Sequence, residues 1–297
     1  MSLPYPAALG ALLSLSGDTN RSLLWDRGVD VYDERWEIPQ KKKRDEEERG
    51  KSDFLRRFRS SFTQPQPDFT AFLARRDSAL KVIGAQSLTL ASATRLVIGL
   101  GLPHPFETGF LFDRLSGCPY LPGSSVKGLV RGAARLVIAG ELEGNQGFWS
   151  DHFAGLLGPE MAGGVPAAKG KAAFYDAFPD RWPELEIDVL TPHYRAYYEA
   201  SVPPPPGDWE DPVPVPFLTV KAGTPFRFYF SAAREVRLKD APAEIEMLLR
   251  TALDWLGIGA KKATGYGSFK TPAENAEVEE KPSRKAKGVT LRSTGVR

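Results

Sequence analysis

Two amphipathic helical patterns, each placed between strand-like segments, restrict the fold of this chain more than any other feature of its sequence. Apolar residues recur at the spacing of one helical face in two places that lie far apart along the chain. The first set is Val126, Leu129, Val130, Ala133 and Val137, and the second is Ile245, Leu248, Leu249, Ala252, Leu253 and Leu256. Gly257 follows the second set, as expected where a left-handed residue ends a helix. Each helix therefore needs another layer of structure against which to bury its apolar face.

Strand-like segments provide that layer. The candidate strands are residues 88–90 and 94–100 before the first helix, 171–178 and 225–232 between the helices, and 266–270 after the second. The segment 94–100 is nearly continuous in apolar residues, which predicts a central strand. In 225–232, Phe226, Phe228 and Phe230 alternate with Arg227 and Tyr229. The order strand, helix, strand, strand, helix, strand predicts an α+β, ferredoxin-like (RRM-like) fold, with an antiparallel sheet and both helices on one face.

Residues 1–84 are expected to form a helical extension in front of this domain. Four apolar residues, Phe54, Leu55, Phe58 and Phe62, recur at helical spacing, and a second helical pattern follows Pro67. The mixed-charge run at 41–49 is typical of an exposed helix or loop, because it offers nothing to bury.

The domain itself is expected to span residues 85–270 and to carry an insertion at about 181–223. Four consecutive prolines, at positions 203 to 206, predict that the insertion is irregular. Residues 271–297 carry acidic and then basic side chains with almost no large apolar ones, so we expect a disordered tail there.

Composition excludes several classes of function. The formal net charge of the 297 residues is +2, so nucleic-acid binding cannot be inferred from bulk charge and must rest on where the cations lie. With a single cysteine, Cys118, and three scattered histidines, the chain has little material for a metal site and none for an internal disulfide. We expect no metal and no cofactor. The sequence has no apolar stretch of membrane-spanning length and no basic leader, which predicts a cytoplasmic protein with no membrane contact.

The first segment that indicates binding is residues 122–135, where Lys127, Arg131 and Arg135 stand four residues apart and have no acid three or four residues away. Such a cationic stripe favours an anionic partner. Ser124 and Ser125 can cap the helix, and with the unpaired N–H groups of its first turn they offer a seat for a phosphate. Two further glycines within the helix, at positions 128 and 132, suggest that something approaches it closely. A solvated helix face packed against the sheet is the alternative interpretation.

The second segment is residues 257–269, where four glycines stand among basic and hydroxyl side chains. Gly259 and Gly265 belong to this set, and Lys261, Lys262 and Thr264 supply phosphate contacts. Tyr266 is expected to stack on a base. The alternative is a glycine-rich turn that merely joins a helix to a strand. If the two segments meet in space, they form one basic groove.

Weaker candidates lie elsewhere. His104 and His193 are the residues that would act as general base or acid if the protein cut RNA. Arg114 is a candidate RNA contact in the loop that leads to the first helix, although a surface ion pair with Asp113 explains it as well. The spacing around Lys127 departs from the Walker pattern, because the lysine precedes the second glycine and no hydroxyl residue follows, so ATP chemistry is not expected.

Residues 118–128 and 257–269 together resemble the two signatures of the RAMP superfamily, the repeat-associated proteins of CRISPR systems. Further matches at 99–101, 107–109 and 188–194 look most like the sixth-subunit family of the type III-B Cmr effector complex, and the resemblance covers roughly residues 90–270. It implies a ferredoxin-like domain at the end of the helical backbone of that complex. Its implied partners are the 3′ part of the CRISPR RNA, target RNA and neighbouring Cmr-type RAMP subunits. It also implies that no residue of this subunit is catalytic.

Three functions remain open from the sequence. The favoured one is an RNA-holding structural subunit, whose contacts tolerate any sequence because they fall on phosphates. The second is a metal-independent endoribonuclease that processes CRISPR RNA. The third is a protein-interaction module whose basic residues pair with an acidic partner.

Overall fold

A four-stranded antiparallel sheet forms the centre of the computed structural model, which describes residues 19–32, 38, 50–159, 168–191, 214–232 and 239–271. The strand order is β2-β5-β1-β6. The strands are β1 (Gln86–Ser92), β2 (Ala172–Pro179), β5 (Pro225–Ala232) and β6 (Phe269–Lys270). The predicted α+β class and the strands expected at 171–178 and 225–232 are confirmed, whereas the last strand is shorter than expected.

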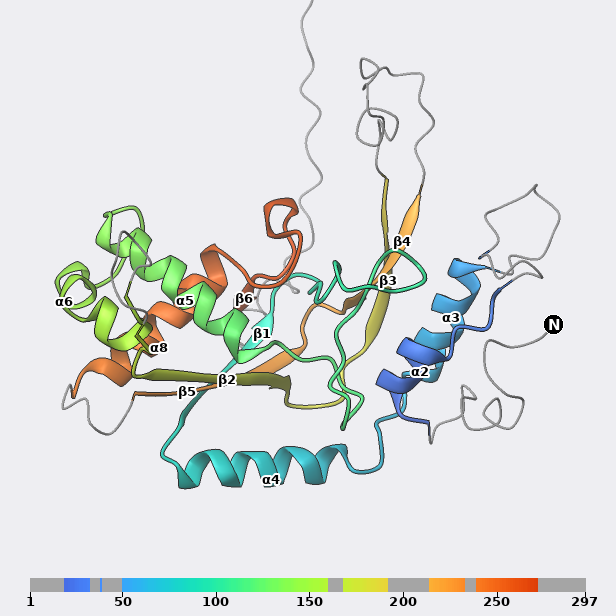
Figure 1. The fold of residues 1–297 in the computed structure, drawn as a ribbon, viewed down its shortest axis with the longest axis horizontal. Helices are drawn as coiled ribbons and strands as arrows, with labels where there is room; N and C mark the ends of the chain where they lie inside the picture. The colour runs from blue at the N-terminus through green and yellow to red at the C-terminus, as the bar shows by residue number, and fades with distance from the viewer. Residues whose placement is uncertain are drawn as a thin grey trace, which may run out of the picture.

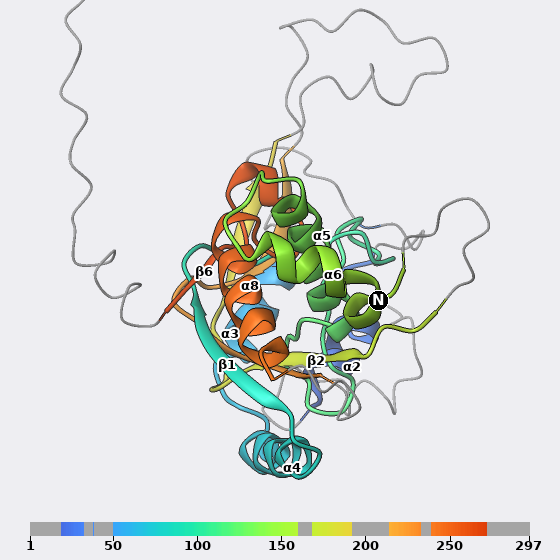
Figure 2. The same ribbon diagram turned by 90° about the vertical axis from the view of Figure 1, so that its left-hand side faces the viewer.

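Helices α5 (Gly123–Ile138), α6 (Gln146–Leu157) and α8 (Ala241–Trp255) lie together on one face of this sheet (Figures 1 and 2). Both helical patterns in the sequence are confirmed, because α5 buries Val126 and Val130 and α8 buries Ile245 and Leu249. The three phenylalanines of β5 are fully buried in the same core. The spacing of apolar residues thus placed each helix correctly and identified the face that it buries.

Helix α4 (Phe69–Val82) covers the opposite face of the sheet, below it in Figure 1. Arg227 of β5 forms an ion pair with Asp77 of α4, and the guanidinium of Arg76 lies over the rings of Phe178, at 5.0 Å, and Tyr229, at 5.2 Å. The helix predicted after Pro67 is therefore confirmed. It is not merely appended to the domain, since it forms a second helical layer on the sheet.

The strand expected at 94–100 is absent. Of this segment only Leu96 makes a β-bridge, to Val220, although Leu96, Val97 and Ile98 are all buried. A continuous apolar run indicates that a segment is buried on every side. It does not distinguish a central strand from an irregular buried segment. Here the run passes between two sheets and then turns at Gly99, whose φ is +71°.

The insertion expected to be irregular instead begins and ends in strands. These are β3 (Leu185–Leu190) and β4 (Val215–Val220), which pair antiparallel as a separate two-stranded sheet. The pairing is possible because β3 alternates, with Leu185 and Ile187 packed on the core and Glu186 and Asp188 turned toward Arg95. The proline run, the charged run at 41–49 and the tail beyond position 271 lie outside the described residues.

Beside this second sheet lie α2 (Arg21–Arg27) and α3 (Lys51–Ser61), the latter at the predicted position. They are held by a cluster of aromatic rings at centroid distances between 4.7 and 6.2 Å. The rings belong to Trp25, Phe54, Phe58, Phe62, Phe112 and Trp182. The aromatic residues of the N-terminal region therefore join it to the loop before α5 and to the segment that leads into β3.

Candidate functional site

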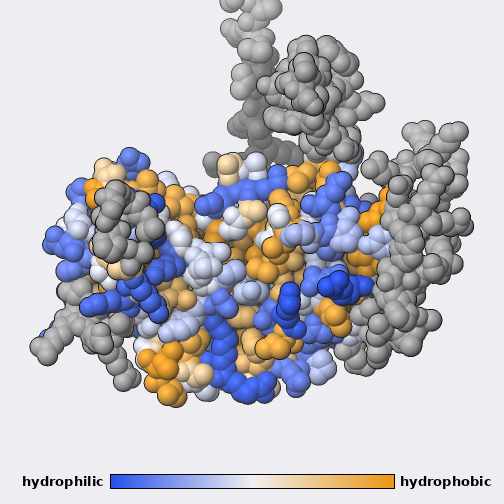
Figure 3. Space-filling model, in the orientation of Figure 1, coloured by the Kyte–Doolittle hydropathy of each residue, from blue (hydrophilic) through white to orange (hydrophobic). Residues whose placement is uncertain are grey.

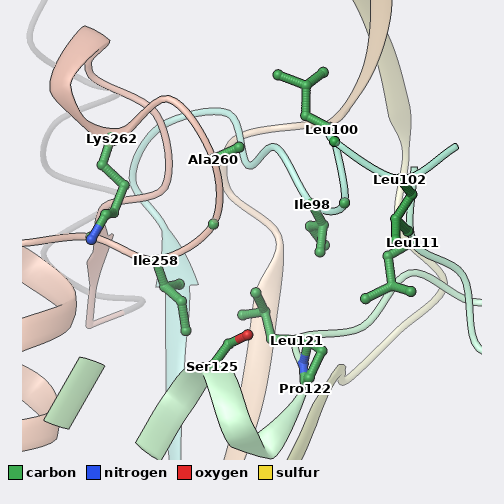
Figure 4. A pocket seen from close by; sticks show the side chains of 14 residues that line it. Ile98, Leu100, Leu102, Leu111, Leu121, Pro122, Ser125, Ile258, Ala260 and Lys262 are labelled. Carbon is green, nitrogen blue, oxygen red and sulfur yellow. The ribbon is translucent and has the colours of Figure 1, made fainter. Parts of the chain in front are cut away.

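The two glycine-and-lysine segments meet at one pocket of about 440 Å³ (Figure 4). One side is formed by Leu121, Pro122 and Ser125 at the start of α5. Another consists of residues 257–260 with Lys262, and residues 98–102 complete the wall. Segments more than a hundred residues apart in sequence are thus brought together, as the prediction of one basic groove required.

The glycines of the second segment are explained by contacts within the chain. Gly257, Gly259 and Gly267 all have positive φ, and a Cβ atom would come within 2.9 Å of Gly267 O, 2.4 Å of Val97 O and 2.0 Å of Ile258 O, respectively. Only Gly265, with a φ of +93°, has open space around it. Their number is therefore no argument for a ligand, because a compact turn that touches residues 95–97 already needs three of them.

This glycine loop, residues 257–267, is fixed to its neighbours by backbone hydrogen bonds. Ala260 donates to Val97 O at 2.8 Å, Gly267 donates to Arg95 O at 2.9 Å, and Ile258 donates to Gly267 O at 2.8 Å. Lys261 adopts the left-handed conformation, with a φ of +58°, and a turn of 3-10 helix, η1 (Lys262–Thr264), follows it. Consecutive left- and right-handed residues aim their N–H groups toward one point, which is a geometry suited to an anion. The loop is thus a rigid support that leaves Lys262, Thr264 and Gly265 exposed.

Tyr266 is engaged within the protein. Its hydroxyl donates to Asp188 Oδ2 at 2.7 Å, and its ring packs edge-on against Phe217 at 6.2 Å. Burial and the hydrogen bond to Asp188 raise the pKa of Tyr266 above its ordinary value of 10.0. The expected role of stacking on a base has no support in this arrangement, which assigns Tyr266 to the joint between the glycine loop and β3.

The first turn of α5 differs from the expected open phosphate seat. Neither serine caps the helix, because Pro122 holds the N-cap position and Ser124 and Ser125 lie inside the first turn with exposed side chains. Asp176 of β2 occupies the terminus instead, and its Oδ1 accepts the N–H of Gly123 at 2.7 Å. The expectation failed because the acid that satisfies this helix end is far away in sequence.

The cationic stripe on α5 contains two kinds of side chain. Arg131 donates to three carbonyl oxygens, of Leu157, Gly158 and Pro159, at 2.7 to 2.9 Å, and lies over the ring of Phe153. It thereby holds the end of α6. Arg135 is exposed further along the helix.

Lys127 stands among other cations. Burial lowers its pKa below the ordinary value of 10.5, and the nearby charges of Arg131 and Lys169 lower it further. Like charges that destabilise one another favour an anion between them. Lys169 was missed by sequence reasoning, because only the folded chain brings it to Lys127.

Gly128 and Gly132, inside α5, have open space in the described structure where a side chain would stand. A Cβ atom on Gly128 or Gly132 would meet no atom within 4 Å. The close approach inferred from them is therefore not made by the described residues. By helical geometry, Gly128 lies on the exposed surface between Ser125 and Lys127, so an incoming chain can reach the helix backbone there.

Arg114 lies outside this site. It is exposed on a turn that is held to α2, where Asn20 Nδ2 donates to the carbonyl oxygens of Arg114 and Leu115 at 3.2 and 3.1 Å. Asp113 forms no ion pair with it in the described structure and instead accepts the N–H and hydroxyl of Ser116. Arg114 does not line the pocket at which the two segments meet.

His104 has a structural environment. Its Nδ1 accepts the N–H of Phe106 at 3.2 Å, so Nε2 carries the proton and donates to Trp25 O at 3.0 Å, and the ring stacks on Trp25 at 4.1 Å. Burial lowers the pKa of His104 below its ordinary value of 6.5, which favours the neutral ring. With both nitrogens engaged, His104 is poorly placed for proton transfer. His193 lies outside the described residues.

Trp255 is a second residue that sequence reasoning missed. It ends α8 immediately before the glycine loop, and it is 77% exposed. The helical spacing already indicated that Trp255 is exposed, because this residue falls outside the apolar face that includes Ile245 and Leu249.

Metal centres and membrane spans are two further classes of site to consider in the described residues. They contain no group of three or more His, Cys, Asp or Glu side chains arranged to hold a metal ion. No helix among them has the length and apolar character needed to cross a membrane. The face shown in Figure 3 mixes hydrophilic and hydrophobic residues, as ordinary protein surfaces do.

Comparison with known proteins gives a family match over most of this region. The family model described as the RAMP superfamily matches residues 89–270, more than half of the chain. A Pyrococcus furiosus protein named CRISPR system Cmr subunit Cmr6 is 30% identical over 223 residues, which cover 59% of this chain and 64% of that protein. The Saccharolobus solfataricus protein of the same name is 29% identical over 187 residues, covering 61% of this chain and 55% of its own length. The matched region thus spans less than two thirds of either relative.

Among solved structures, a chain of the type III-B Cmr-beta complex bound to cognate target RNA superposes with a TM-score of 0.51. The identity is 23%, and the match covers 75% of this chain and 76% of that one. At this identity the similarity concerns the fold.

Proposed function

The chain belongs to the RAMP superfamily, and from this premise we propose that it is an RNA-holding subunit of a type III-B (Cmr) CRISPR effector complex. In this proposal it corresponds to the sixth subunit, binds the 3′ part of the CRISPR RNA, and contacts neighbouring RAMP subunits and, through them, target RNA. The names of the two curated relatives support the assignment. The chain's own surface supports the RNA-holding role.

The observation that carries the proposal is the meeting of the two cationic segments at one pocket. Lys262 lines this pocket from the glycine loop, and Ser125 lines it from α5. Lys127, crowded by Arg131 and Lys169, lies on the same half of α5. A single strand that crosses α5 at Gly128 can therefore place phosphates near Lys262 and Lys127 and approach the helix backbone between them.

We also propose that the central domain is ferredoxin-like. The chain order β1-α5-β2-β5-α8-β6 and the strand order β2-β5-β1-β6 agree with a split βαβ arrangement. In this arrangement α5 and α8 are the two helices of the motif, and both functional segments are connected to them.

Holding RNA is favoured over cutting it. The hydrogen bonds of His104 to Phe106 and Trp25 engage both ring nitrogens, which weakens the case for His104 as the base. The competing function, a metal-independent endoribonuclease, predicts that labelled repeat RNA is cleaved by the purified protein and that replacing one histidine abolishes cleavage. We expect binding without cleavage.

The binding test compares two double variants that each remove two positive charges. Lys261→Ala with Lys262→Ala changes the proposed site, whereas Arg75→Ala with Lys81→Ala removes two exposed cations from α4, across the sheet. For a single strand, the logarithm of the binding constant falls by about 0.7 per neutralised phosphate for each tenfold rise in salt. Titration of labelled single-stranded RNA should therefore show at least about tenfold weaker binding and a salt slope shallower by about 1.4 for the site variant. Equal behaviour of the two variants would refute the site.

A further inference from the structure

The floor of the pocket is apolar although its rim is cationic. Side chains of Ile98, Leu102, Leu111, Leu121 and Ile258 form much of the wall (Figure 4). Among the described residues, Ser125 and Lys262 are the only ones with polar side chains in the lining, and none is acidic. An anion alone has no use for such a floor, because phosphates bind to N–H groups and cations at a polar surface. The pocket therefore suits a ligand that has both an apolar face and a negative charge.

The backbone around the pocket is already hydrogen-bonded. The carbonyl oxygens of Ile98, Gly99 and Leu100 accept N–H groups from Leu111, Leu102 and Gly109 at 2.9 to 3.2 Å. These groups are thus engaged within the protein, and the wall presents mainly hydrocarbon to an occupant. It can select by shape and planarity, but it has few groups with which to tell one base from another.

The pocket is held open by the fold. Gly99 has a φ of +71°, and a Cβ atom there would lie 2.8 Å from both Leu102 and Leu111. Gly259 has a φ of +96°, and its Cβ would lie 2.4 Å from Val97 O. These two glycines let two segments of the wall pack closely against their neighbours within the chain, so the pocket does not have to form when a ligand arrives.

We propose that this pocket receives one unstacked base of the bound RNA strand, while Lys262 and Lys127 hold the flanking phosphates. The inference rests on the proposed function and adds to it the part of the RNA that enters the protein. A single strand can splay a base out of its stack, and every base has an apolar face that such a wall can cover. The cationic rim favours this occupant over an apolar side chain of a neighbouring subunit, which gains nothing from Lys262. A purine should bind more tightly than a pyrimidine because it buries more surface, with no further preference for base identity.

The test fills the pocket without changing its charge. Ala260 lines the pocket, so Ala260→Leu should exclude the base, whereas Ala74→Leu makes the same change at an exposed site on α4. A series of RNAs carrying 2-aminopurine at one position at a time reports the environment of each base. With the unmodified protein, we expect one position to show a distinct rise in emission on binding. Ala260→Leu should abolish that signal and weaken binding by about tenfold, whereas Ala74→Leu should change neither.

A second variant guards against misfolding of the first. Leu102 lines the pocket and is 42% exposed, so Leu102→Ala should fold normally and reduce both the 2-aminopurine signal and the RNA affinity.

The inference is overturned if no RNA position shows a distinct 2-aminopurine emission. It is also overturned if Ala260→Leu binds RNA like the unmodified protein while the Lys261 and Lys262 variant still binds weakly. In that result the proposed function survives. If the lysine variant also binds normally, the proposed function fails as well. Loss of subunit assembly in Ala260→Leu with the fluorescence signal intact would assign the pocket to a protein partner and overturn the inference.

Discussion

Glycines have two opposite meanings at this site. In the glycine loop, Gly259 and Gly267 are fixed by the nearness of Val97 O and Ile258 O, so no other residue fits there. On α5, Gly128 and Gly132 have open space and an ordinary helical conformation. The same residue type thus reports internal packing in one segment and an uncovered helix surface in the other. A sequence cannot separate these cases, because the distinction depends on backbone atoms that are distant along the chain.

Replacing both open glycines, as Gly128→Ala with Gly132→Ala, should stabilise the protein. Alanine is favoured over glycine in a helix interior by about 1 kcal/mol, so the double variant should gain about 2 kcal/mol in the free energy of unfolding. Urea unfolding followed by circular dichroism measures this gain. Gly123→Ala is the contrasting control, because its Cβ would lie 2.3 Å from Phe174 O and should destabilise. A loss of stability in the double variant would mean that the helix surface is covered within the chain after all.

At the scale of elements, the link between β2 and α5 defines the candidate site. The pairing of β2 with β5 shifts register between Tyr175 and Phe178, and Asp176 lies in this gap. The irregularity places its carboxylate at the positive end of the α5 dipole, where it accepts the N–H of Gly123. An acid thus stands beside Ser124 and Ser125, at the point where the sequence alone predicted a free phosphate seat.

Two replacements of Asp176 should separate its cap from its charge. Asp176→Ala removes the acceptor and should lower the free energy of unfolding by about 1 kcal/mol, as other cap losses do. Asp176→Asn keeps an acceptor and removes the negative charge, so it should cost less stability. Because a charge near a helix end contributes about 0.3 to 1 kcal/mol, Asp176→Asn should bind RNA about two- to fivefold more tightly. RNA titration and thermal unfolding of both variants measure the two effects, and unchanged RNA affinity in both would place the strand away from this helix end.

The elements that could be predicted were those whose apolar spacing was long and regular. Helices α3, α4, α5 and α8 and strands β2 and β5 followed directly from it. Helix α6 was missed although Asn145 caps it and Trp149, Phe153 and Leu156 are buried at helical spacing. The apolar run at 94–100 was wrongly assigned to a strand, because burial on all sides has no period from which a strand can be recognised.

The candidate site was predictable in its parts and not in its contacts. The sequence singled out Ser125 and Lys262, which line the pocket where the two segments meet, and Lys127, which does not line it. It could not show that Asp176 fills the helix end or that Asp188 binds Tyr266, since both acids come from other strands. Partner residues of this kind are brought together by the tertiary fold, so the spacing of residues along one segment does not predict them.

At the scale of the whole molecule, the two sheets are joined through a network centred on Asp188. Arg95 donates from Nε to Glu186 at 2.6 Å and from Nη1 to Asp188 at 2.7 Å, and both acids belong to β3. Tyr266 donates to the same Asp188 oxygen, and Gly267 donates to the carbonyl of Arg95. The glycine loop, the segment after β1 and the β3-β4 sheet are therefore linked, so the position of the lysines depends on a strand that does not contact the pocket.

Asp188→Asn should weaken this joint in a pH-dependent way. Burial raises the pKa of Asp188, but hydrogen bonds from Tyr266, the N–H of Val189 and Arg95 outweigh it and hold the pKa below the ordinary value of 3.8. A carboxylate with a depressed pKa in the folded state adds stability that is fully present above its unfolded value and is lost as the pH falls through the folded value. Since Arg95 is 44% exposed and water screens the pair, the loss in the variant should be about 1 kcal/mol at pH 7. Urea unfolding should show this difference unchanged down to about pH 5 and shrinking below pH 3.8.

The control variant is Glu184→Gln, which removes an equal charge from the exposed pair with Lys221 beside the same sheet and should change stability little. A difference that persisted in acid, or that Glu184→Gln reproduced, would show that the Asp188 network does not join the two sheets.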